Sequence, residues 1–358
     1  MRKRRRIKSW RRFMTETARE IIESYRGRPL RIMEVCGTHT HEIFRLGIRK
    51  ILPEKITLIS GPGCPVCVTP AGFIDEAVFL ALEKKVLLCT FGDLIRVPGT
   101  QKSLAKAREE GGEIRTVYSP LDALETAEKN PGKNVVFLSV GFETTVPGTC
   151  LAVRKALERK ITNFSILGAN KTMPNAYAAL KGSADAFLYP GHVSVITGTK
   201  IYEELREQGV SGVVAGFTAE EILSSLAAIV RLSGKKEPFF LNCYPRVVTR
   251  EGNPAAMALI REVMQPCDAR WRGLGVIPGS GLELREKYIS FDARKRFSVP
   301  EMTGEGNKGC QCGRVLKGEI KPCECPLFGK ACTPLKPVGA CMVSNEGACS
   351  AFYQYGEN

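Results

Sequence analysis

Residues 30–37, LRIMEVCG, indicate the fold class, because they form an apolar run that ends at a glycine and passes straight into the polar stretch THTHE. The same pattern recurs in ITLISG, VLLCTFG, IRTVYS, VVFLSVG, FSILGA, AFLYPG and VVAG. Amphipathic stretches such as GFIDEAVFLALEK and TAEEILSSLAAIVRLS separate these runs. Apolar strands that are each followed by a helix predict an α/β fold with parallel sheets buried on both faces.

Four pairs of segments resemble each other in the same order along the chain. EVCGTHT (Glu34–Thr40) resembles SVGFETT (Ser139–Thr145), and LISGPGCPVCVTPAGFIDEA resembles SILGANKTMPNAYAAL. CTFGDLIRVPGT ends like LYPGHVSVITGT, and VYSPLDAL resembles VAGFTAEEIL. The offset is roughly a hundred residues each time, the size of a small domain. We therefore expect two similar parallel-sheet α/β domains related by an internal repeat, residues 28–130 and 131–235.

The two ends of the chain depart from this pattern. Residues 9–25 carry apolar side chains at helical spacing, which predicts an amphipathic helix within an N-terminal unit, residues 1–27, that packs on the third domain. After Lys235 the alternation stops, and glycine, proline and cysteine become frequent. We expect residues 236–358 to form a third, irregular domain that depends on a metal site for order.

Composition bounds the class of protein. The chain has 358 residues, a formal net charge of +15 and 14 cysteines. The basic start, MRKRRRIKSWRR, suits a solvated helix or a docking surface for an acidic partner protein, and no aromatic-interleaved basic stripe elsewhere indicates nucleic acid. No apolar run has the length of a membrane span, and no apolar region follows the basic start as a secretion signal requires. We therefore expect a cytoplasmic protein that binds neither membrane nor nucleic acid.

The cysteines near the C-terminus point to a metal centre. A [4Fe–4S] cluster takes four thiolates, and tetrahedral zinc is the main rival because C-x-C pairs also suit it. The long, uneven intervals favour an iron–sulfur cluster held by an irregular loop, with structural thiols as the last alternative. The seven cysteines of this region are Cys310, Cys312, Cys323, Cys325, Cys332, Cys341 and Cys349.

The segment GPGCPVCVTP places Cys64 and Cys67 in a C-x-x-C motif directly after a strand. This spacing allows a strained, reversible disulfide, and a helix that begins near residues 70–72 would lower the thiol pKa. Half of a zinc site is the alternative. A Cys64→Ser substitution is expected to cost little stability, since a loop thiol carries little packing.

The segment CGTHTHEIF joins Cys36 at a strand end to His39 and His41, which are spaced to point to one side of an extended chain. A thiolate beside imidazoles can bind Fe(II) or zinc, and α/β folds place ligands at the carboxyl edge of a parallel sheet. A buried cysteine with two turn histidines is an equally good interpretation of this motif alone.

Four further polar residues occupy predicted loops: His192, Glu143, Asp93 and Arg96. Each alone is better explained as a loop or capping residue than as a catalyst. Together they suggest that both domains direct their loops into one cleft. Neither G-x-x-x-x-G-K-[ST] nor G-x-G-x-x-G is present, so nucleotide use is unsupported.

These motifs together resemble one family closely, that of the hydrogenase maturation factor HypD, over nearly the whole chain. The matching motifs are CGTHTH (Cys36–His41), GPGCPVC (Gly61–Cys67), FGDLIRVPG (Phe91–Gly99), GFETT (Gly141–Thr145), GHVS (Gly191–Ser194) and the terminal ECPLFGKACTP and MVSNEGACSAFYQYG.

The resemblance implies two related α/β domains and a third domain that holds a [4Fe–4S] cluster. It implies a complex with the small chaperone HypC, on which the Fe(CN)2CO group of [NiFe]-hydrogenase is assembled. Cyanide would come from HypE, working with HypF, as a thiocyanate, and the finished group would pass to the hydrogenase large subunit. The protein would be a redox-active assembly scaffold rather than a turnover enzyme with a small-molecule substrate.

The same resemblance implies roles for single residues. Cys36 would be the iron ligand from this chain, completed by a cysteine of HypC, with His39 beside it. Cys64 and Cys67 would be a dithiol/disulfide pair between the iron site and the cluster. Glu346 would tune the cluster or relay protons.

For the cluster itself, the resemblance implies the ligands Cys310, Cys325, Cys332 and Cys349. Cys312 competes with Cys310 for the first position, and Cys323 and Cys341 lie outside the family pattern. Two other functions stay open: a free-standing thiol–disulfide oxidoreductase that uses its cluster on a protein substrate, and a zinc-stabilised binding module without redox chemistry.

Overall fold

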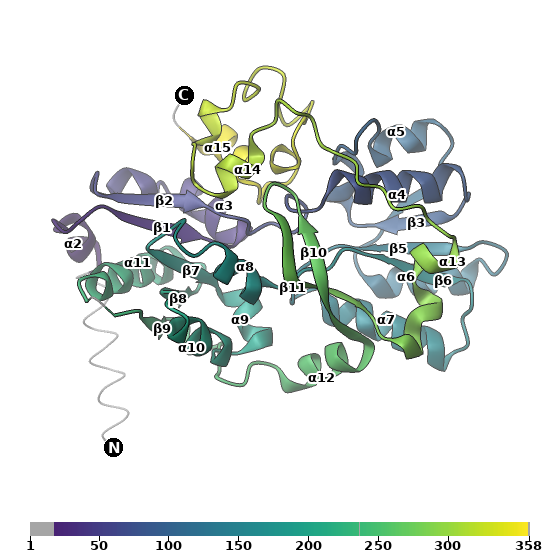
Figure 1. The fold of residues 1–358 in the computed structure, drawn as a ribbon, viewed down its shortest axis with the longest axis horizontal. Coiled ribbons are helices and arrows are strands. Elements are labelled where there is room, and N and C mark those ends of the chain that lie inside the picture. The colour runs from purple at the N-terminus through teal and green to yellow at the C-terminus, as the bar shows by residue number, and fades with distance from the viewer. Residues whose placement is uncertain (1–17, 236, 357–358) are drawn as a thin grey trace.

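The computed structural model describes residues 18–235 and 237–356, and it contains two parallel sheets side by side (Figure 1). The five-stranded sheet has the order β2-β1-β7-β8-β9, and the four-stranded sheet has the order β4-β3-β5-β6. The strands are β1 (Leu30–Glu34), β2 (Ile56–Ser60), β3 (Leu87–Thr90), β4 (Ile114–Thr116), β5 (Val135–Ser139), β6 (Phe164–Gly168), β7 (Ala186–Pro190), β8 (Gly212–Ala215) and β9 (Phe240–Asn242).

The two halves of the chain exchange strands between these sheets. β1 and β2 share a sheet with β7 and β8, whereas β3 and β4 share a sheet with β5 and β6. The four pairs of similar segments match β1–β4 in one half of the chain to β5–β8 in the other. When the strands of each half are counted from first to fourth, both sheets contain them in the order second, first, third, fourth. A boundary at residue 130 would separate β3 from β5, which are hydrogen bonded from Leu87↔Val135 onward. The strand sequences are alike in both halves. They therefore could not show which strands of one half share a sheet with which strands of the other.

Helices cover both faces of each sheet, as the apolar strands predicted. On β1, Ile32 contributes to the buried cluster on one face and Met33 to the cluster on the other. The helices of this region are α3 (Gly37–Arg45), α4 (Ala71–Leu82), α5 (Leu104–Glu109), α6 (Pro120–Lys129), α7 (Val146–Glu158), α8 (Met173–Ala179), α9 (Gly191–Thr197), α10 (Lys200–Glu207), α11 (Ala219–Ser233) and the 3-10 turns η1 (Ile48–Ile51) and η2 (Gly92–Arg96).

The N-terminal helix is described only in its last part, α2 (Ala18–Glu23). Ala18 and Ile22 lie in one buried cluster with Leu226 of α11. The described part of this helix therefore packs on the five-stranded sheet unit, in a cluster that Phe239 and Leu241 also join, and the packing of the whole helix on residues 236–358 stays a prediction. The predicted helical residues before Ala18, and the whole basic start, lie outside the described residues.

The C-terminal third is less irregular than predicted. Besides β9, it contains a long antiparallel hairpin that lies between the two sheets (Figure 1). Its core-facing residues alternate with exposed ones, which is the pattern of a half-buried strand. Its elements are α12 (Pro254–Val263), β10 (Met264–Trp271), β11 (Gly275–Leu284), η3 (Glu286–Phe291), α13 (Ala293–Arg296), α14 (Cys312–Leu316), η4 (Pro322–Glu324), η5 (Ala340–Met342) and α15 (Ala348–Tyr355).

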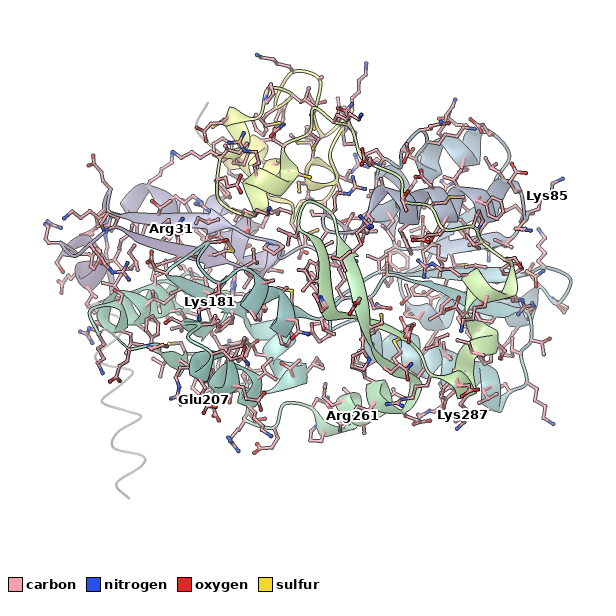
Figure 2. All side chains as sticks on the ribbon, in the orientation of Figure 1. Arg31, Lys85, Lys181, Glu207, Arg261 and Lys287 are labelled. Atoms are coloured by element: carbon pink, nitrogen blue, oxygen red, sulfur yellow. The ribbon has the colours of Figure 1, made fainter. Side chains whose placement is uncertain are left out.

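Charged side chains cover the outside of the molecule, as the labelled Arg31, Lys85, Lys181, Glu207 and Lys287 illustrate (Figure 2). Among the residues that the structure describes, no helix is both long enough and apolar enough to cross a bilayer.

Candidate thiol and metal site

Cys36 lies where β1 ends and α3 begins, and it is the N-cap residue of that helix. The position is the carboxyl edge of a parallel sheet, as predicted. Only 8% of the residue is exposed. Burial raises the pKa of its thiol to about 11, although backbone N–H groups of His39 and Thr38 favour the thiolate.

Glu346 comes from the distant C-terminal segment and closes over Cys36. Thr38 Oγ1 donates a hydrogen bond of 2.9 Å to Glu346 Oε1. The Glu346 side chain also packs on Gly37, where an added Cβ would lie 2.3 Å from the Cβ of Glu346. Cys36 and Glu346 were both expected to be functional residues, with Glu346 acting at the cluster. The fold brings Glu346 beside Cys36 as well.

His39 and His41 do not point to one side, because α3 begins at Gly37 and the chain is helical here rather than extended. His39 is fully buried, and its ring stacks on Phe217 with centroids 4.6 Å apart. His192 stacks on the same Phe217 at 3.8 Å. His41 instead meets the edge of Tyr355. The fold thus gathers His39 and His192 around one phenylalanine and sends His41 elsewhere.

The His39 imidazole is held neutral with one defined tautomer. Its Nε2 lies 2.8 Å from the carbonyl oxygen of Gly216, so Nε2 carries the proton and donates it. Burial, followed by repulsion from His192, lowers the pKa of His39 to about 4. Its Nδ1 is buried and has no hydrogen-bond partner in the described part of the chain, so a lone pair is available there.

The C-x-x-C loop lies directly against Cys36. Gly37 N donates to Gly63 O at 3.1 Å, and a Cβ on Gly63 would lie 2.3 Å from the backbone nitrogen of Cys36. The loop can approach this closely only because residue 63 has no side chain.

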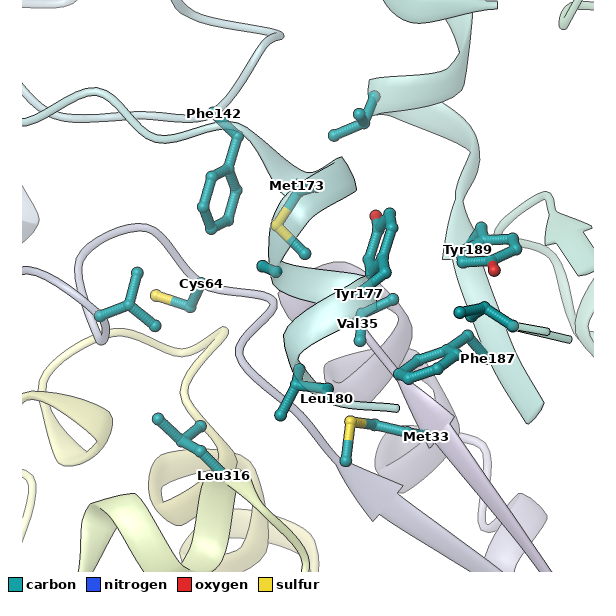
Figure 3. Packing of buried hydrophobic residues seen from close by; sticks show 14 of the residues in the cluster. Met33, Val35, Cys64, Phe142, Met173, Tyr177, Leu180, Phe187, Tyr189 and Leu316 are labelled. Atoms are coloured by element: carbon teal, nitrogen blue, oxygen red, sulfur yellow. The ribbon is translucent and has the colours of Figure 1, made fainter. Parts of the chain in front are cut away.

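Cys64 and Cys67 are core residues, at 3% and 1% exposure. Figure 3 shows Cys64 within the central cluster, which also includes Phe142 and Leu316. The premise that this loop thiol carries little packing is therefore wrong, and the expected modest loss of stability in a Cys64 variant stays a prediction.

The expected helix does begin next to this loop, with Pro70 as the N-cap of α4. The predicted lowering of the thiol pKa is wrong for Cys67, however. Hydrogen bonds with Cys341 and Cys64, together with burial, raise the pKa of Cys67 well above its usual value.

One cavity gathers the cysteines of the C-terminal segment. It includes all four cysteines that the resemblance assigned to a cluster and two more. Cys323 is exposed and lies outside it. The cysteines that line the cavity are Cys310, Cys312, Cys325, Cys332, Cys341 and Cys349.

A continuous chain of thiols joins this cavity to the C-x-x-C loop. Cys67 contacts both Cys64 and Cys341, and Cys341 in turn contacts Cys312. Hydrogen bonds from Cys312 and Cys67 lower the pKa of Cys341. Cys310 continues the series through a hydrogen bond with Cys312. The place of Cys341 in this series could not be predicted from sequence, because the spacing of Cys341 matches no motif.

The other predicted loop residues divide into two groups. Glu143 is buried and accepts a 2.9 Å hydrogen bond from the backbone N–H of Met173. Arg96 donates to the carbonyl oxygens of Pro334 and Val343 and so fixes the C-terminal segment. Asp93 is exposed. Glu143 and Arg96 thus have structural contacts near the centre.

Sulfur dominates the donor set of this site. Within residues 18–235 and 237–356, no three His, Cys, Asp or Glu side chains are arranged to ligate a single metal ion. Thiolates in number are the ligands of iron–sulfur clusters, and an isolated thiolate with a neutral imidazole nearby suits one soft or borderline metal. Fold and site together define an α/β thiol protein with candidate metal-binding cysteines at its centre.

Comparison with known proteins identifies the family. The HypD family model, described as "Hydrogenase formation hypA family", matches residues 12–356. The chain is 43% identical to the hydrogenase maturation factor HypD of Cupriavidus necator, over 93% of this chain and 92% of that protein. It is 45% identical to HypD of Escherichia coli, over 92% and 90%. A putative hydrogenase expression/formation protein of Methanocaldococcus jannaschii is 44% identical, over 91% and 92%. The chain therefore belongs to the HypD family of hydrogenase maturation factors.

Proposed function

We propose that this protein is a cytoplasmic maturation scaffold for [NiFe]-hydrogenase, on which the Fe(CN)2CO group is held and assembled in complex with the chaperone HypC. HypE, working with HypF, is the cyanide donor, and the hydrogenase large subunit receives the finished group. Membership of the HypD family supports this function. The single observation that carries the mechanism is the series of buried thiols from the C-x-x-C loop, which touches Cys36, to the six-cysteine cavity.

Cys36 is the iron anchor from this chain. The thiol is buried at the edge of β1, and its proton must leave when iron binds, since the thiolate is the ligand. A thiolate suits low-spin Fe(II) that also carries cyanide and CO. Glu346, hydrogen bonded to Thr38, is the nearest carboxylate to take up that proton. His39 contributes its backbone N–H to the Cys36 thiolate, while its ring keeps an unprotonated Nδ1.

Cys310, Cys325, Cys332 and Cys349 are the cluster ligands in this proposal. They fit a [4Fe–4S] cluster because all four line one cavity and are soft donors. When bound, the cluster would supply single electrons. The remaining thiols of the cavity, Cys312 and Cys341, are then free for thiol chemistry with Cys67.

Release of cyanide from a thiocyanate requires two electrons, and a Cys64/Cys67 dithiol provides them on forming its disulfide. Cys341 contacts Cys67 and is the thiol placed to attack this disulfide. The mixed disulfide formed in this way returns to thiols by taking up two electrons and two protons, and the bound cluster would supply the electrons one at a time. The burial of all three thiols keeps solvent oxidants away from the exchange.

The test is infrared spectroscopy of the complex with HypC, purified without oxygen. The parent protein should show bands from iron-bound CN and CO. Cys36→Ala should lose them because the iron loses its anchor, while Cys64→Ser should retain cluster absorption but stop hydrogenase maturation. Maturation that survives Cys36→Ala would contradict the anchoring role.

The alternative is a thiol–disulfide oxidoreductase that acts on a protein substrate, which the buried position of Cys64 and Cys67 disfavours. The other alternative is a zinc-stabilised binding module without redox chemistry. Analysis of iron and acid-labile sulfide tests it. Stoichiometric zinc without sulfide would overturn both redox functions.

A further inference from the structure

A second cavity, of about 430 Å³, lies where the chain crosses from the four-stranded to the five-stranded sheet. Its walls come from the end of β6, the start of α4, the β10–β11 hairpin and the segment around α13. The volume is in the range of small-molecule sites, and the carboxyl ends of parallel strands are where such sites form. The proposed maturation chemistry does not use this cavity.

Lys171 is the unusual residue of its lining. The lysine is 3% exposed, and its backbone is fixed by a hydrogen bond to Gly141 O. Its Nζ donates to Ala169 O at 3.3 Å and lies 5.8 Å from the centroid of the Trp271 ring. In the described part of the chain, no carboxylate forms an ion pair with this amine. A buried amine without a counter-ion is costly unless a ligand supplies the negative charge.

Asn170, the preceding residue, adds an unused donor to the same lining. It is 3% exposed, and its Oδ1 accepts a 2.7 Å hydrogen bond from Ser139 Oγ. Its Nδ2 is buried without a partner among the described residues. Buried amide groups are nearly always hydrogen bonded, so this one indicates a missing acceptor.

Most other charged groups of the lining have partners, whereas Arg270, Lys295 and Glu301 are exposed. Arg294 donates to Glu76 Oε2 at 2.7 Å and to Gly168 O at 2.8 Å. Asp292 caps α13 and Asp268 accepts from Gly279 N. Glu283 accepts from a neighbouring glutamine.

Lys171 therefore contributes the one uncompensated buried charge of the lining. Burial, and next Arg294, lower its pKa to about 7. The thiol of Cys267 cannot balance it, because burial raises the pKa of that thiol to about 11. The remaining surface is largely apolar, with Phe73, Ile166 and Leu282.

We propose that this cavity binds a small organic monocarboxylate, whose oxygens accept hydrogen bonds from Lys171 Nζ while its carbon chain contacts the apolar wall. One negative charge matches the one buried cation that has no carboxylate partner. A phosphate dianion would bring a second charge that no buried cation of this lining balances, because Arg270 and Lys295 are exposed to solvent, and a neutral ligand would give Lys171 no counter-ion.

Calorimetric titration of the full-length, anaerobically purified protein with butyrate at pH 8 tests this site, with inorganic phosphate titrated in parallel. Butyrate should bind one to one with uptake of a proton, measured in buffers of different ionisation heat, because the bound carboxylate favours the charged amine. Absence of saturable binding at millimolar butyrate, or equally tight binding of phosphate, would overturn the proposal.

Lys171→Met keeps the length of the side chain but removes the charge. It should weaken butyrate binding by about tenfold or more, the value of a charge-assisted hydrogen bond, and abolish the proton uptake. The matched control is Lys181→Met, an exposed lysine that donates to Gln208 O and should leave binding unchanged. Asn170→Asp should also weaken binding, and circular dichroism checks that each variant folds. Unaltered affinity in both site variants would remove these residues from the site.

Discussion

Several ionisable side chains near the centre are kept uncharged by burial. His39 is neutral because its pKa falls to about 4, and Cys36 is a thiol because its pKa rises to about 11. Glu143 follows the same rule, and burial raises its pKa to about 7. At neutral pH, His39 and Cys36 therefore carry no fixed charge, whereas Glu143 is protonated in about half of the molecules.

The raised pKa of Glu143 predicts that the free energy of unfolding depends measurably on pH. Its usual pKa is 4.5, so between pH 4.5 and about 7 the folded protein keeps a proton that the unfolded chain has lost. The free energy of unfolding should therefore fall as pH rises through this window, by up to about 3 kcal/mol from this group. Glu143→Gln should remove this contribution and be more stable than the parent at pH 8, but not at pH 4.5.

Urea unfolding at both pH values checks this prediction. Glutamine at this position can still accept the hydrogen bond from Met173 N. Glu125→Gln is the control, since Glu125 is an exposed partner of Lys129 and should change stability by less than about 1 kcal/mol at either pH. Parallel pH profiles of parent and Glu143→Gln would show that Glu143 is not the cause.

The positions of single residues could be predicted from the sequence where their neighbours along the chain determine them. Cys36 at a strand end and the dithiol loop could be predicted for that reason. The opposite directions of His39 and His41 could not, because they depend on α3 starting at Gly37 rather than a turn later. Cys341 was missed since only the folded chain brings it against Cys67.

Among the elements, the loop between β2 and α4 has a strict packing requirement at Gly63. A Cβ at Gly63 would lie 2.3, 2.5 and 2.6 Å from backbone atoms of Cys36. Gly63→Ala should therefore push the dithiol loop away from Cys36 and cost about 1–3 kcal/mol, as overpacking typically does. Urea unfolding and the rate of alkylation of Cys64 by iodoacetamide measure the two effects.

Gly132→Ala is the matched control for this loop, because nothing lies within 4 Å of a Cβ at that position. It should leave both the stability and the alkylation rate close to those of the parent. If Gly63→Ala behaves like Gly132→Ala, the close approach of the loop to Cys36 is not required.

At the level of the whole molecule, the exchange of strands determines which pieces of the chain can fold. Residues 28–130 contain two strands of each sheet, β1–β2 and β3–β4. Residues 68–169 contain the complete four-stranded sheet. Two-stranded pieces are marginal in water, so the first fragment should show no cooperative urea transition while the second should retain one. A cooperative transition in residues 28–130 would contradict the observed strand pairing.

Strands and helices could be predicted from periodicity, and the repeat from four similar segment pairs. The partition of strands between sheets could not, because β3 and β7 end alike and either could follow β2. The hairpin was missed because its proline, glycine and cysteine content resembles a loop, although its burial alternates. Long-range pairing, rather than local preference, decided these points.

The polypeptide passes between the two sheets through the linkers at residues 61–70 and 169–172, and each linker carries reactive groups: Cys64 and Cys67 in the first, Asn170 and Lys171 in the second. A small tilt of one sheet against the other would change the backbone conformation of these two linkers before it changed that of any strand. Partner docking that rocked the sheets would therefore shift the sulfur atoms and the buried amine in concert.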